Sequence, residues 1–163
     1  HGRGDVTLTG QMGDVMQESA RTAVTWVRAH AARYGIPEDE LKHHDLHIHV
    51  PAGAVPKDGP SAGVVMVAAL VSLLTERAVN PLVAMTGELT LSGHVLPVGG
   101  LEEKLLAARR SGIHRLILPA ANAGELAAID RGGVELDLVS TVEEALERVL
   151  PPFGLHDLAQ HVG

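Results

Sequence analysis

One stretch, residues 56–75, constrains the fold more than any other part of the chain. It reads Pro-Lys-Asp-Gly-Pro-Ser-Ala-Gly-Val-Val-Met-Val-Ala-Ala-Leu-Val-Ser-Leu-Leu-Thr, a turn rich in proline and glycine followed by an apolar run. Pro60 cannot continue a strand, so the chain must break before Ser61. A helix that is apolar on every side has to be buried on every side. The stretch therefore predicts a central buried helix with Ser61 on its first turn, either as a helix cap or as a reactive hydroxyl.

The composition limits the class of protein. A chain of 163 residues suits a single domain with a sizeable core, and 45 % of its residues are apolar, mostly aliphatic. The net charge of −7 and the presence of only one Trp, one Tyr and one Phe argue against binding to nucleic acid or to an anionic membrane. The absence of cysteine fits a reducing compartment. The longest apolar run, residues 62–74, is too short to span a bilayer, and no signal peptide is visible. We therefore expect a cytoplasmic domain.

Strand patterns alternate with helix patterns along the chain. Period-two or β-branched runs predict strands at residues 5–9, 46–50, 82–86, 89–91, 94–98, 115–119 and 134–139. Helical spacing predicts helices at residues 14–34, 61–75, 101–111, 123–129 and 141–150. Capping boxes are expected at Asp14 with Gln17 and at Thr141 with Glu144, and residues 38–45 are expected to be polar and exposed. The alternation predicts an α/β fold with packed helices, and the ribbon at 82–98 makes its sheet mixed. Residues 152–163 are expected to form a loose tail.

A lysine lies inside an apolar helix stripe. Leu101, Leu105 and Ala108 form the stripe of the helix at 101–111, and Lys104 falls between them. Lysine occurs only at positions 42, 57 and 104, although arginine is common. An amine in apolar surroundings gives up its proton more readily than one in water, which a guanidinium cannot do. The alternative is that the stem of Lys104 is buried while its amine reaches water.

Three constellations could carry chemistry. The first is Ser61 with Lys104, a serine nucleophile and a lysine general base that together form a Ser-Lys dyad. The second is a triad of Ser61 with His49 and Asp58, although Asp58 is too close to Ser61 in sequence for the usual geometry. The third is a phosphate cradle at residues 59–63, which lacks the P-loop pattern.

Histidines cluster before the apolar helix. The strand at 46–50 places His47 and His49 on one face, and His43 and His44 are nearby. The cluster contains no cysteine and no obvious carboxylate, so we expect hydrogen-bonding histidines next to a site and no metal.

Four motifs, in order, resemble the Lon family of ATP-dependent proteases. They are Pro-Lys-Asp-Gly-Pro-Ser-Ala-Gly at 56–63, Thr-Gly-Glu-Leu-Thr-Leu-Ser-Gly-His-Val-Leu-Pro-Val-Gly-Gly-Leu-Glu-Glu-Lys at 86–104, and the shorter matches at 5–20 and 47–51. The resemblance covers the chain up to about residue 151. It implies the Lon protease-domain fold, which is similar to domain 2 of ribosomal protein S5, and a serine endopeptidase that degrades unfolded or damaged proteins through an acyl-enzyme.

The resemblance also implies roles for particular residues. Ser61 matches the family nucleophile, Lys104 the dyad lysine, and Thr86 a threonine that holds the lysine amine. His47, His49 and Asp58 match polar residues at the border of the site. Two departures from the family pattern are Ala52, where a glutamate is usual, and Glu102, where a basic residue is frequent.

The same resemblance implies partners and cofactors. Family members assemble as rings, usually homohexamers, with a motor module that uses ATP and Mg²⁺. The chain has no Walker A motif, so we expect the motor to lie outside it, together with the N-terminal part of the proteolytic domain, and no cofactor to bind this domain. The expected partners are unfolded protein or peptide substrates, with no nucleic acid and no membrane. The alternative is a non-proteolytic Lon-like oligomerisation or interaction module, which typically lacks the serine.

Overall fold

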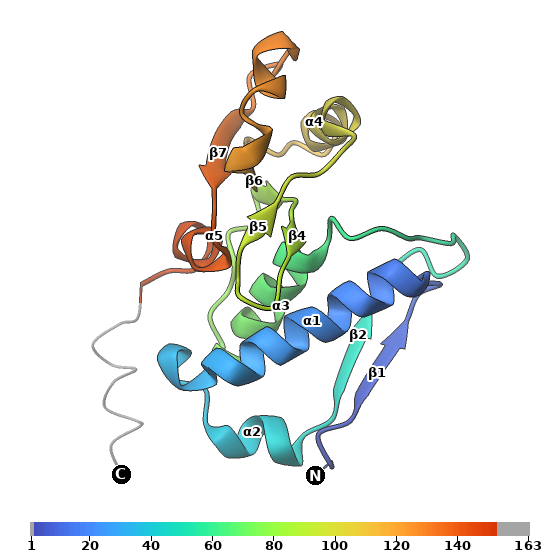
Figure 1. Cartoon of the computed structure of the whole chain (residues 1–163), viewed down its shortest axis with the longest axis vertical. Coiled ribbons are helices and arrows are strands. Elements are labelled where there is room, and N and C mark those ends of the chain that lie inside the picture. Colours follow the sequence, from blue (N-terminus) through green and yellow to red (C-terminus); the bar gives the residue numbers. More distant parts are fainter. Residues whose placement is uncertain (1, 153–163) are drawn as a thin grey trace.

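The computed structural model describes residues 2–152, which form helices packed against small sheets (Figure 1). The strands are β1 (Val6–Thr9), β2 (Leu46–His49), β3 (Val83–Met85), β4 (Glu88–Leu89), β5 (Val95–Leu96), β6 (Arg115–Pro119) and β7 (Glu135–Val139). The α-helices are α1 (Asp14–His30), α2 (Glu38–His43), α3 (Gly63–Thr75), α4 (Leu101–Arg110) and α5 (Val142–Val149). The 3₁₀-helices are η1 (Ala31–Tyr34), η2 (Ala120–Asn122) and η3 (Glu125–Ala128). The predicted α/β class is confirmed, and the expected loose tail lies outside the described residues from 153 onward.

The strands form three separate small sheets. β1 pairs with β2 in parallel, β3, β6 and β7 form a parallel sheet in the order β3-β6-β7, and β4 pairs with β5 antiparallel. Of the ribbon expected at 82–98, only β4 and β5 form an antiparallel pair, because β3 pairs with β6 in the parallel sheet instead. The β4-β5 ribbon does not share a sheet with the parallel strands. It contacts the segment that follows β7: the Val95 N–H donates to the Ser140 carbonyl at 2.9 Å, the Val142 N–H donates to the Gly93 carbonyl at 2.9 Å, and His94 forms an isolated bridge with Thr141.

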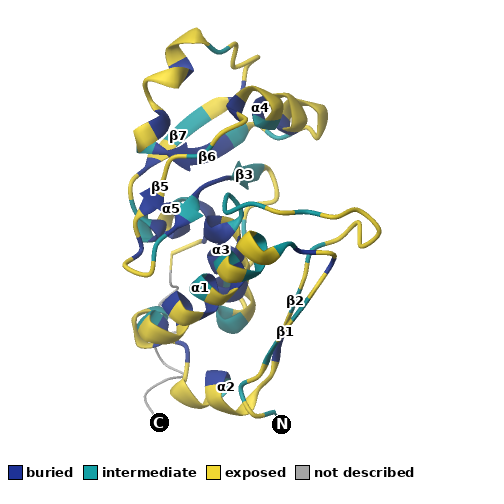
Figure 2. Cartoon of the chain, turned by 45° about the vertical axis from the view of Figure 1, so that its right-hand side comes forward, coloured by how far each residue is buried: buried dark blue, intermediate teal, exposed yellow. Residues whose placement is uncertain are grey.

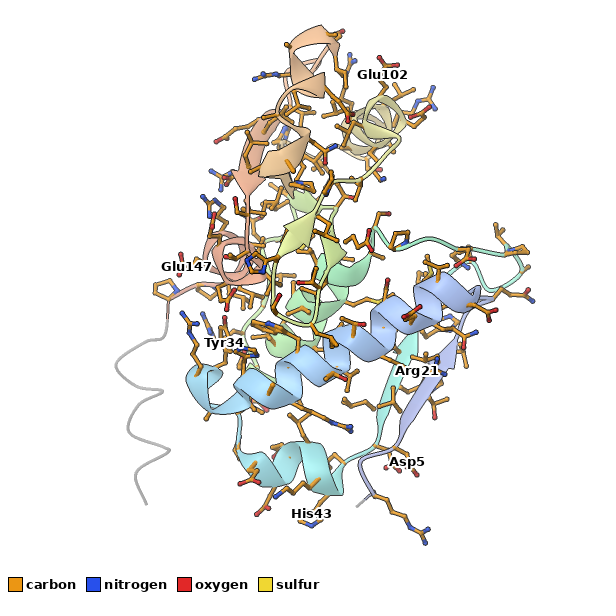
Figure 3. All side chains as sticks on the ribbon, viewed as in Figure 1. Asp5, Arg21, Tyr34, His43, Glu102 and Glu147 are labelled. Atoms are coloured by element: carbon orange, nitrogen blue, oxygen red, sulfur yellow. The ribbon has the colours of Figure 1, made fainter. Side chains whose placement is uncertain are left out.

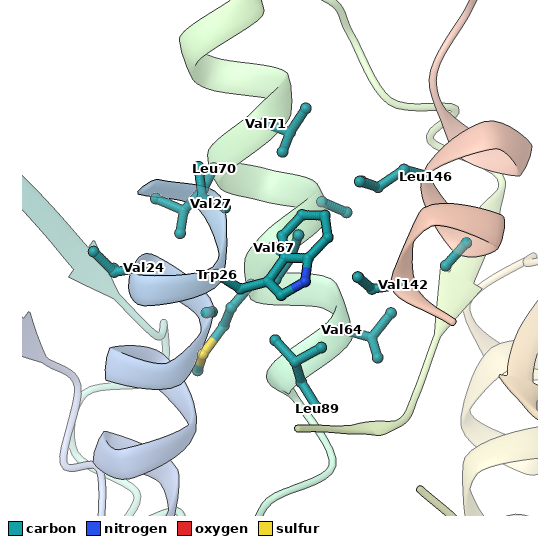
Figure 4. Close-up of a cluster of buried hydrophobic side chains, with 14 of the residues drawn as sticks. Val24, Trp26, Val27, Val64, Val67, Leu70, Val71, Leu89, Val142 and Leu146 are labelled. Carbon is teal, nitrogen blue, oxygen red and sulfur yellow. The ribbon is translucent and has the colours of Figure 1, made fainter. Parts of the chain in front are cut away.

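The main core lies where α1, α3 and α5 face one another (Figures 2 and 4). Val64, Val67 and Val71 of α3 are fully buried there, as the apolar run predicted. The prediction that α3 is buried on every side is wrong, because Leu73 is 66 % exposed and Val65 is 39 % exposed. These two residues lie on the same exposed side of the helix. α3 is therefore covered on most of its circumference and open along one stripe.

A second, smaller core lies between α4 and the β3-β6-β7 sheet. Leu101 and Leu105 of α4 pack there with Leu116 and Leu118 of β6. The predicted apolar stripe of α4 is thereby confirmed. α4 therefore packs against the sheet that contains β3, and this packing places α4 beside the start of α3.

Several local predictions differ from the structure. The capping box at Asp14 is absent: Gly13 occupies the N-cap position of α1, and the Gln17 side-chain amide donates to the Met12 carbonyl at 2.8 Å. Residues 38–43 form a short helix with Leu41 buried, so this segment is not wholly exposed. The helix expected at 123–129 is the short 3₁₀-helix η3.

The C-terminal helix begins as predicted. The hydroxyl of Thr141 accepts a hydrogen bond from the Glu144 N–H at 3.3 Å and so caps α5. Within residues 2–152, no helix combines the length and the hydropathy needed to cross a membrane.

Candidate active site

Ser61 lies in the turn that precedes α3. The prediction that it sits on the first helical turn is off by two residues, because α3 begins at Gly63 and Ala62 occupies the N-cap position without a side-chain cap. The Ser61 hydroxyl makes no hydrogen bond within residues 2–152, so it is not a capping group. Its carbonyl oxygen accepts hydrogen bonds from the Gly87 N–H at 2.9 Å and from the Thr86 hydroxyl at 3.4 Å. The turn after β3 therefore fixes the backbone of Ser61 and leaves its side chain free.

Gly87 is required at this junction. A Cβ atom at this position would come within 2.6 Å of Val95 and 2.9 Å of Val64, so no larger residue fits without displacement. The Gly87 carbonyl also accepts from the Val64 N–H at 3.3 Å, which ties the first turn of α3 to the same point. The close approach of two backbones thus sets the position of Ser61 relative to β3.

Lys104 reaches the same region from α4. Its neighbours in the stripe, Leu101 and Leu105, are buried, and Lys104 itself is half-buried. The Lys104 Nζ donates a hydrogen bond to the Gly99 carbonyl at 2.7 Å. Among residues 2–152, the hydrogen bonds do not include one between Ser61 and Lys104. The amine therefore has a fixed backbone partner at the start of its own helix.

Ser61, Thr86 and Lys104 line one pocket of about 360 Å³. Most of its wall is apolar and comes from α3, β3, α4 and β6; the other lining residues are Ala62, Val65, Ala84, Met85, Ala107, Ala108, Ser111, Ile113 and Leu116. Thr86 is only 4 % exposed. The structure thus brings together three residues that are distant in the sequence: a hydroxyl, an amine and a second hydroxyl in apolar surroundings. Glu102 is exposed on α4 and does not line this pocket (Figure 3).

His47 and His49 lie outside the lining of this pocket. They share the exposed face of β2, as the period-two pattern predicted, and both rings contact the hydroxyl of Thr9 on β1. The distances are 2.8 Å to His47 Nε2 and 2.8 Å to His49 Nδ1. Within residues 2–152, no group of three or more His, Cys, Asp or Glu side chains is arranged to hold a metal ion.

Asp58 caps helix α1 from a distant loop. Its Oδ1 accepts hydrogen bonds from the Met16 N–H at 3.0 Å and from the Gly59 N–H at 2.8 Å. These backbone donors, Met16 first, hold the pKa of the Asp58 carboxyl below its usual value of 3.8. Gly13 leaves room for the carboxylate, because a Cβ atom there would lie 2.3 Å from Asp58 Cγ. Asp58 therefore anchors the loop that leads to Ser61.

The cap at Asp58 predicts a pH-dependent difference between the wild type and Asp58→Asn. Because the folded-state pKa of Asp58 is lowered, its contribution to stability is present above the unfolded-state pKa of about 4 and is lost as the pH falls through the lower folded-state value. We expect the wild type to have the higher Tm at pH 5–7 and the difference to shrink toward zero at about pH 3. Thermal unfolding from pH 3 to 7 measures this. Asp5→Asn is the matched control, since the Asp5 carboxylate has no hydrogen bond within residues 2–152. Identical Tm values for wild type and Asp58→Asn at pH 7 would contradict the cap.

These contacts weaken the two alternative constellations. The Asp58 carboxylate is engaged with the N-terminus of α1 and His49 with Thr9, so neither group is directed at Ser61. The nearest cation on the loop, Lys57, donates to three backbone carbonyls and is not free to bind a phosphate. Of the residues that the sequence singled out as catalytic or supporting, only Ser61, Thr86 and Lys104 line the pocket.

Sequence reasoning missed the structural roles of Gly87 and Lys57. Gly87 gave no signal beyond its place in a turn. For Lys57, the small number of lysines in the chain was a usable signal. Each of the other two lysines also has a defined partner: Lys104 contacts Gly99, and Lys42 pairs with Glu38 one helical turn away.

The α/β domain thus has a serine and a lysine in the lining of one apolar pocket, the residue types that a serine peptidase with a lysine base uses. The chain belongs to the family of the Lon protease (S16) C-terminal proteolytic domain, whose family model matches residues 1–152. It is 54 % identical over 154 residues to "Lon protease" of Koribacter versatilis and 57 % identical over 152 residues to "Lon protease 1" of Sorangium cellulosum. It is also 54 % identical over 149 residues to "Lon protease 1" of Thermus thermophilus.

These alignments cover 92 %, 91 % and 90 % of this chain, respectively, but 19 % of each relative. The chain thus spans about a fifth of the length of the curated relatives that it matches. The Lon resemblance read from the sequence motifs is confirmed, and the family is one of serine peptidases.

Proposed function

We propose that this chain is a serine endopeptidase domain in which Ser61 and Lys104 form a catalytic dyad. The observation that supports this most directly is that the two side chains line the same pocket from separate elements. A neutral lysine amine has one lone pair and two N–H groups, so Lys104 can accept the proton of Ser61 while it still donates to the Gly99 carbonyl.

The reaction then follows the general course of acyl transfer. Ser61 Oγ attacks the peptide carbonyl as its proton passes to Lys104 Nζ, and the resulting lysine ammonium gives that proton to the leaving amine. Water, deprotonated by the same amine, hydrolyses the acyl-enzyme and frees Ser61. The N–H groups of Gly63 and Val64 already donate to the Pro60 and Gly87 carbonyls. The backbone N–H groups of Ser61 and Ala62 are therefore the candidates for the oxyanion site.

Thr86 and the border residues have supporting roles in this proposal. Thr86 is buried in the same pocket, where its hydroxyl holds the Ser61 carbonyl and lies on the side from which Lys104 approaches. We propose that Thr86 also orients the lysine amine during turnover. Asp58 sets the position of the loop, and His47 and His49 form a polar edge on β2.

The wider activity that we propose follows from the Lon family. The substrates would be unfolded or damaged proteins, delivered by a motor module that uses ATP and Mg²⁺ and lies outside this chain, in a homohexameric ring. We place this activity in the cytoplasm, because a chain without cysteine suits a reducing compartment. The chemistry of the proposed dyad itself requires no metal or cofactor.

Treatment with a peptide boronate tests the nucleophile. We expect one equivalent of adduct per chain in the intact mass measured under native conditions, and the boron on Ser61 Oγ in a structure of the adduct, because the serine oxygen adds to boron to form a tetrahedral mimic of the intermediate. Ser61→Ala should form no adduct, whereas Ser92→Ala, in an exposed turn outside the pocket, should label like the wild type. Labelling at another residue, or peptide hydrolysis that persists in Ser61→Ala, would overturn the assignment. Absence of both labelling and hydrolysis in the wild type would favour a non-proteolytic interaction module.

A further inference from the structure

Lys57 lies on the loop that leads to Ser61, but its side chain is turned toward the opposite end of that loop. Its backbone pairs with the turn between β1 and α1, where it forms an isolated parallel bridge with Met12. The Lys57 N–H donates to the Gln11 carbonyl at 2.9 Å, and the Gly13 N–H donates to the Lys57 carbonyl at 2.6 Å. The loop is thus bound, at Lys57, to a segment more than forty residues earlier in the chain.

The ammonium of Lys57 uses all three of its donors on backbone carbonyls. Nζ lies 2.6 Å from the Gly10 oxygen, 2.9 Å from the Ala52 oxygen and 2.8 Å from the Val55 oxygen. Lysine has three N–H donors and no acceptor, so this set of bonds satisfies it completely. One half-buried side chain therefore joins the end of β1 to both ends of the bend at residues 52–55.

Two of the three carbonyls, those of Gly10 and Ala52, belong to backbone in or next to the left-handed conformation. Ala52 has a φ of 62°, and Gln11, which follows Gly10, has a φ of 58°. Non-glycine residues rarely adopt this left-handed conformation, and it persists only where the surrounding structure enforces it. Lys57 Nζ contacts the carbonyl of Ala52, one of these two residues, and the carbonyl of Gly10, which directly precedes the other, Gln11. The ammonium thus enforces the strained conformation on both sides of the contact.

We propose that Lys57 is a positioning residue for Ser61, an inference that rests on the proposed role of Ser61 as the nucleophile. Between Lys57 and Ser61 there are only three residues, and the first of them, Asp58, caps α1. At its other end the segment is fixed by the hydrogen bond from the Gly87 N–H to the Ser61 carbonyl. Ser61 is therefore held between two fixed points, the Asp58 cap on α1 and the hydrogen bond from Gly87. Lys57 links the first of these points to the core of the domain.

Arginine should be a poor substitute at position 57. The three acceptors surround a single nitrogen, an arrangement that suits a compact ammonium, whereas the donors of a guanidinium lie in one plane and on separate nitrogens. Lys57→Arg keeps the charge, so it separates the geometry of the contact from a simple electrostatic effect of a cation near the pocket.

The experiment compares Lys57→Met and Lys57→Arg with the wild type in the full chain, with Lys42→Met as the matched control. Lys42 is exposed on α2 and pairs with Glu38, one helical turn away. We expect Lys57→Met to lower kcat for a small peptide by roughly 10- to 100-fold, with KM within about twofold, because a shift of about 1 Å at the nucleophile is enough for such a loss. Lys57→Arg should lie between Lys57→Met and the wild type, and Lys42→Met should match the wild type.

Amide hydrogen exchange supplies a second measurement that does not depend on activity. In the wild type we expect the Gly13 and Lys57 amides to be protected, and in Lys57→Met both should exchange at least about tenfold faster while the amides of α3 do not change. Unchanged kcat, or full activity in Lys57→Arg, would overturn the positioning role. A rise in KM at constant kcat would instead indicate contact with the substrate and also contradict the proposal.

The two proposals fail in different ways. If the wild type neither hydrolyses peptides nor labels at Ser61, the proposed function fails, and the positioning role fails with it, while the exchange data still decide whether Lys57 anchors the loop. If the wild type is active but Lys57→Met keeps its kcat, only the positioning role fails. If Lys57→Met does not fold, the kcat of Lys57→Arg and the protection of the wild-type amides decide the outcome.

Discussion

Lys104→Ala is expected to abolish peptide hydrolysis, with a fall in kcat of about 10⁴-fold or more. Removal of a general base costs up to this factor, and a nucleophile and its base act as a unit, so the loss of either removes the function of both. Among residues 2–152, the polar side chains that line the pocket besides Lys104 are the hydroxyls of Ser61, Thr86 and Ser111, and none of these is a second base. Initial rates with a fluorogenic peptide measure the effect, at a temperature where both proteins are folded.

Two further variants separate the role of base from other roles of Lys104. Lys104→Arg keeps a positive charge but cannot give up its proton, so it should be as inactive as Lys104→Ala. The double variant Ser61→Ala/Lys104→Ala should be no slower than either single variant. Lys42→Ala, a change of the same type on exposed helix α2, should keep the wild-type rate. Substantial turnover by Lys104→Arg would show that the charge matters more than proton transfer and would contradict the dyad.

The placement of Ser61 and Lys104 at one pocket could be anticipated because each residue departs from its local pattern, whereas their pairing as a dyad stays a proposal. A serine after Gly-Pro at the head of an apolar helix, and a lysine inside an otherwise apolar stripe, both require an explanation that packing alone does not give. The structure places both in one pocket. What the sequence could not show is the hydrogen bond from Lys104 to Gly99, since it depends on the exact path of the chain before α4.

Contacts between distant segments account for most of the wrong local predictions. The pattern at Asp14 and Gln17 suggested a self-contained cap for α1, but the capping group is Asp58, which arrives from another loop. Such a cap leaves no trace in the sequence around the helix. The sequence likewise predicted one mixed sheet, because strand periodicity identifies strands but not their partners. In the structure β4 and β5 form a separate two-stranded sheet.

Burial around the helices was predicted least well. Uniform apolarity suggested that α3 is enclosed, yet Val65 and Leu73 face outward. In α1, helical spacing predicted the helix itself, whereas the structure shows that Trp26, 1 % exposed, is central to the core. Hydrophobic periodicity shows which side of a helix is buried. The width of the buried face depends on which elements pack against the helix.

Trp26→Ala is expected to cause the largest loss of stability among single substitutions of core side chains. The indole lies between α1, α3 and α5, near Val67 and Leu146, and it stacks on His30 with ring centres 4.2 Å apart (Figure 4). Truncation of a buried tryptophan to alanine costs about 3–5 kcal/mol of unfolding free energy, from lost burial and from the cavity left behind. Because domains of this size have only about 5–15 kcal/mol in total, the variant should be close to unfolding at 37 °C. Denaturation followed by circular dichroism measures this, since the only tryptophan is removed.

Trp26→Phe is the informative control for this substitution. Trp26 Nε1 is buried and has no hydrogen-bond partner among residues 2–152, and such a donor costs about 1–3 kcal/mol. Phenylalanine removes this donor and leaves a smaller cavity than alanine does, so the two effects oppose each other and the net loss should be only about 1–2 kcal/mol. Trp26 does not line the pocket that contains Ser61, so the folded fraction of either variant should keep its kcat. A loss below about 1 kcal/mol for Trp26→Ala would show that the three-helix cluster is not the main source of stability.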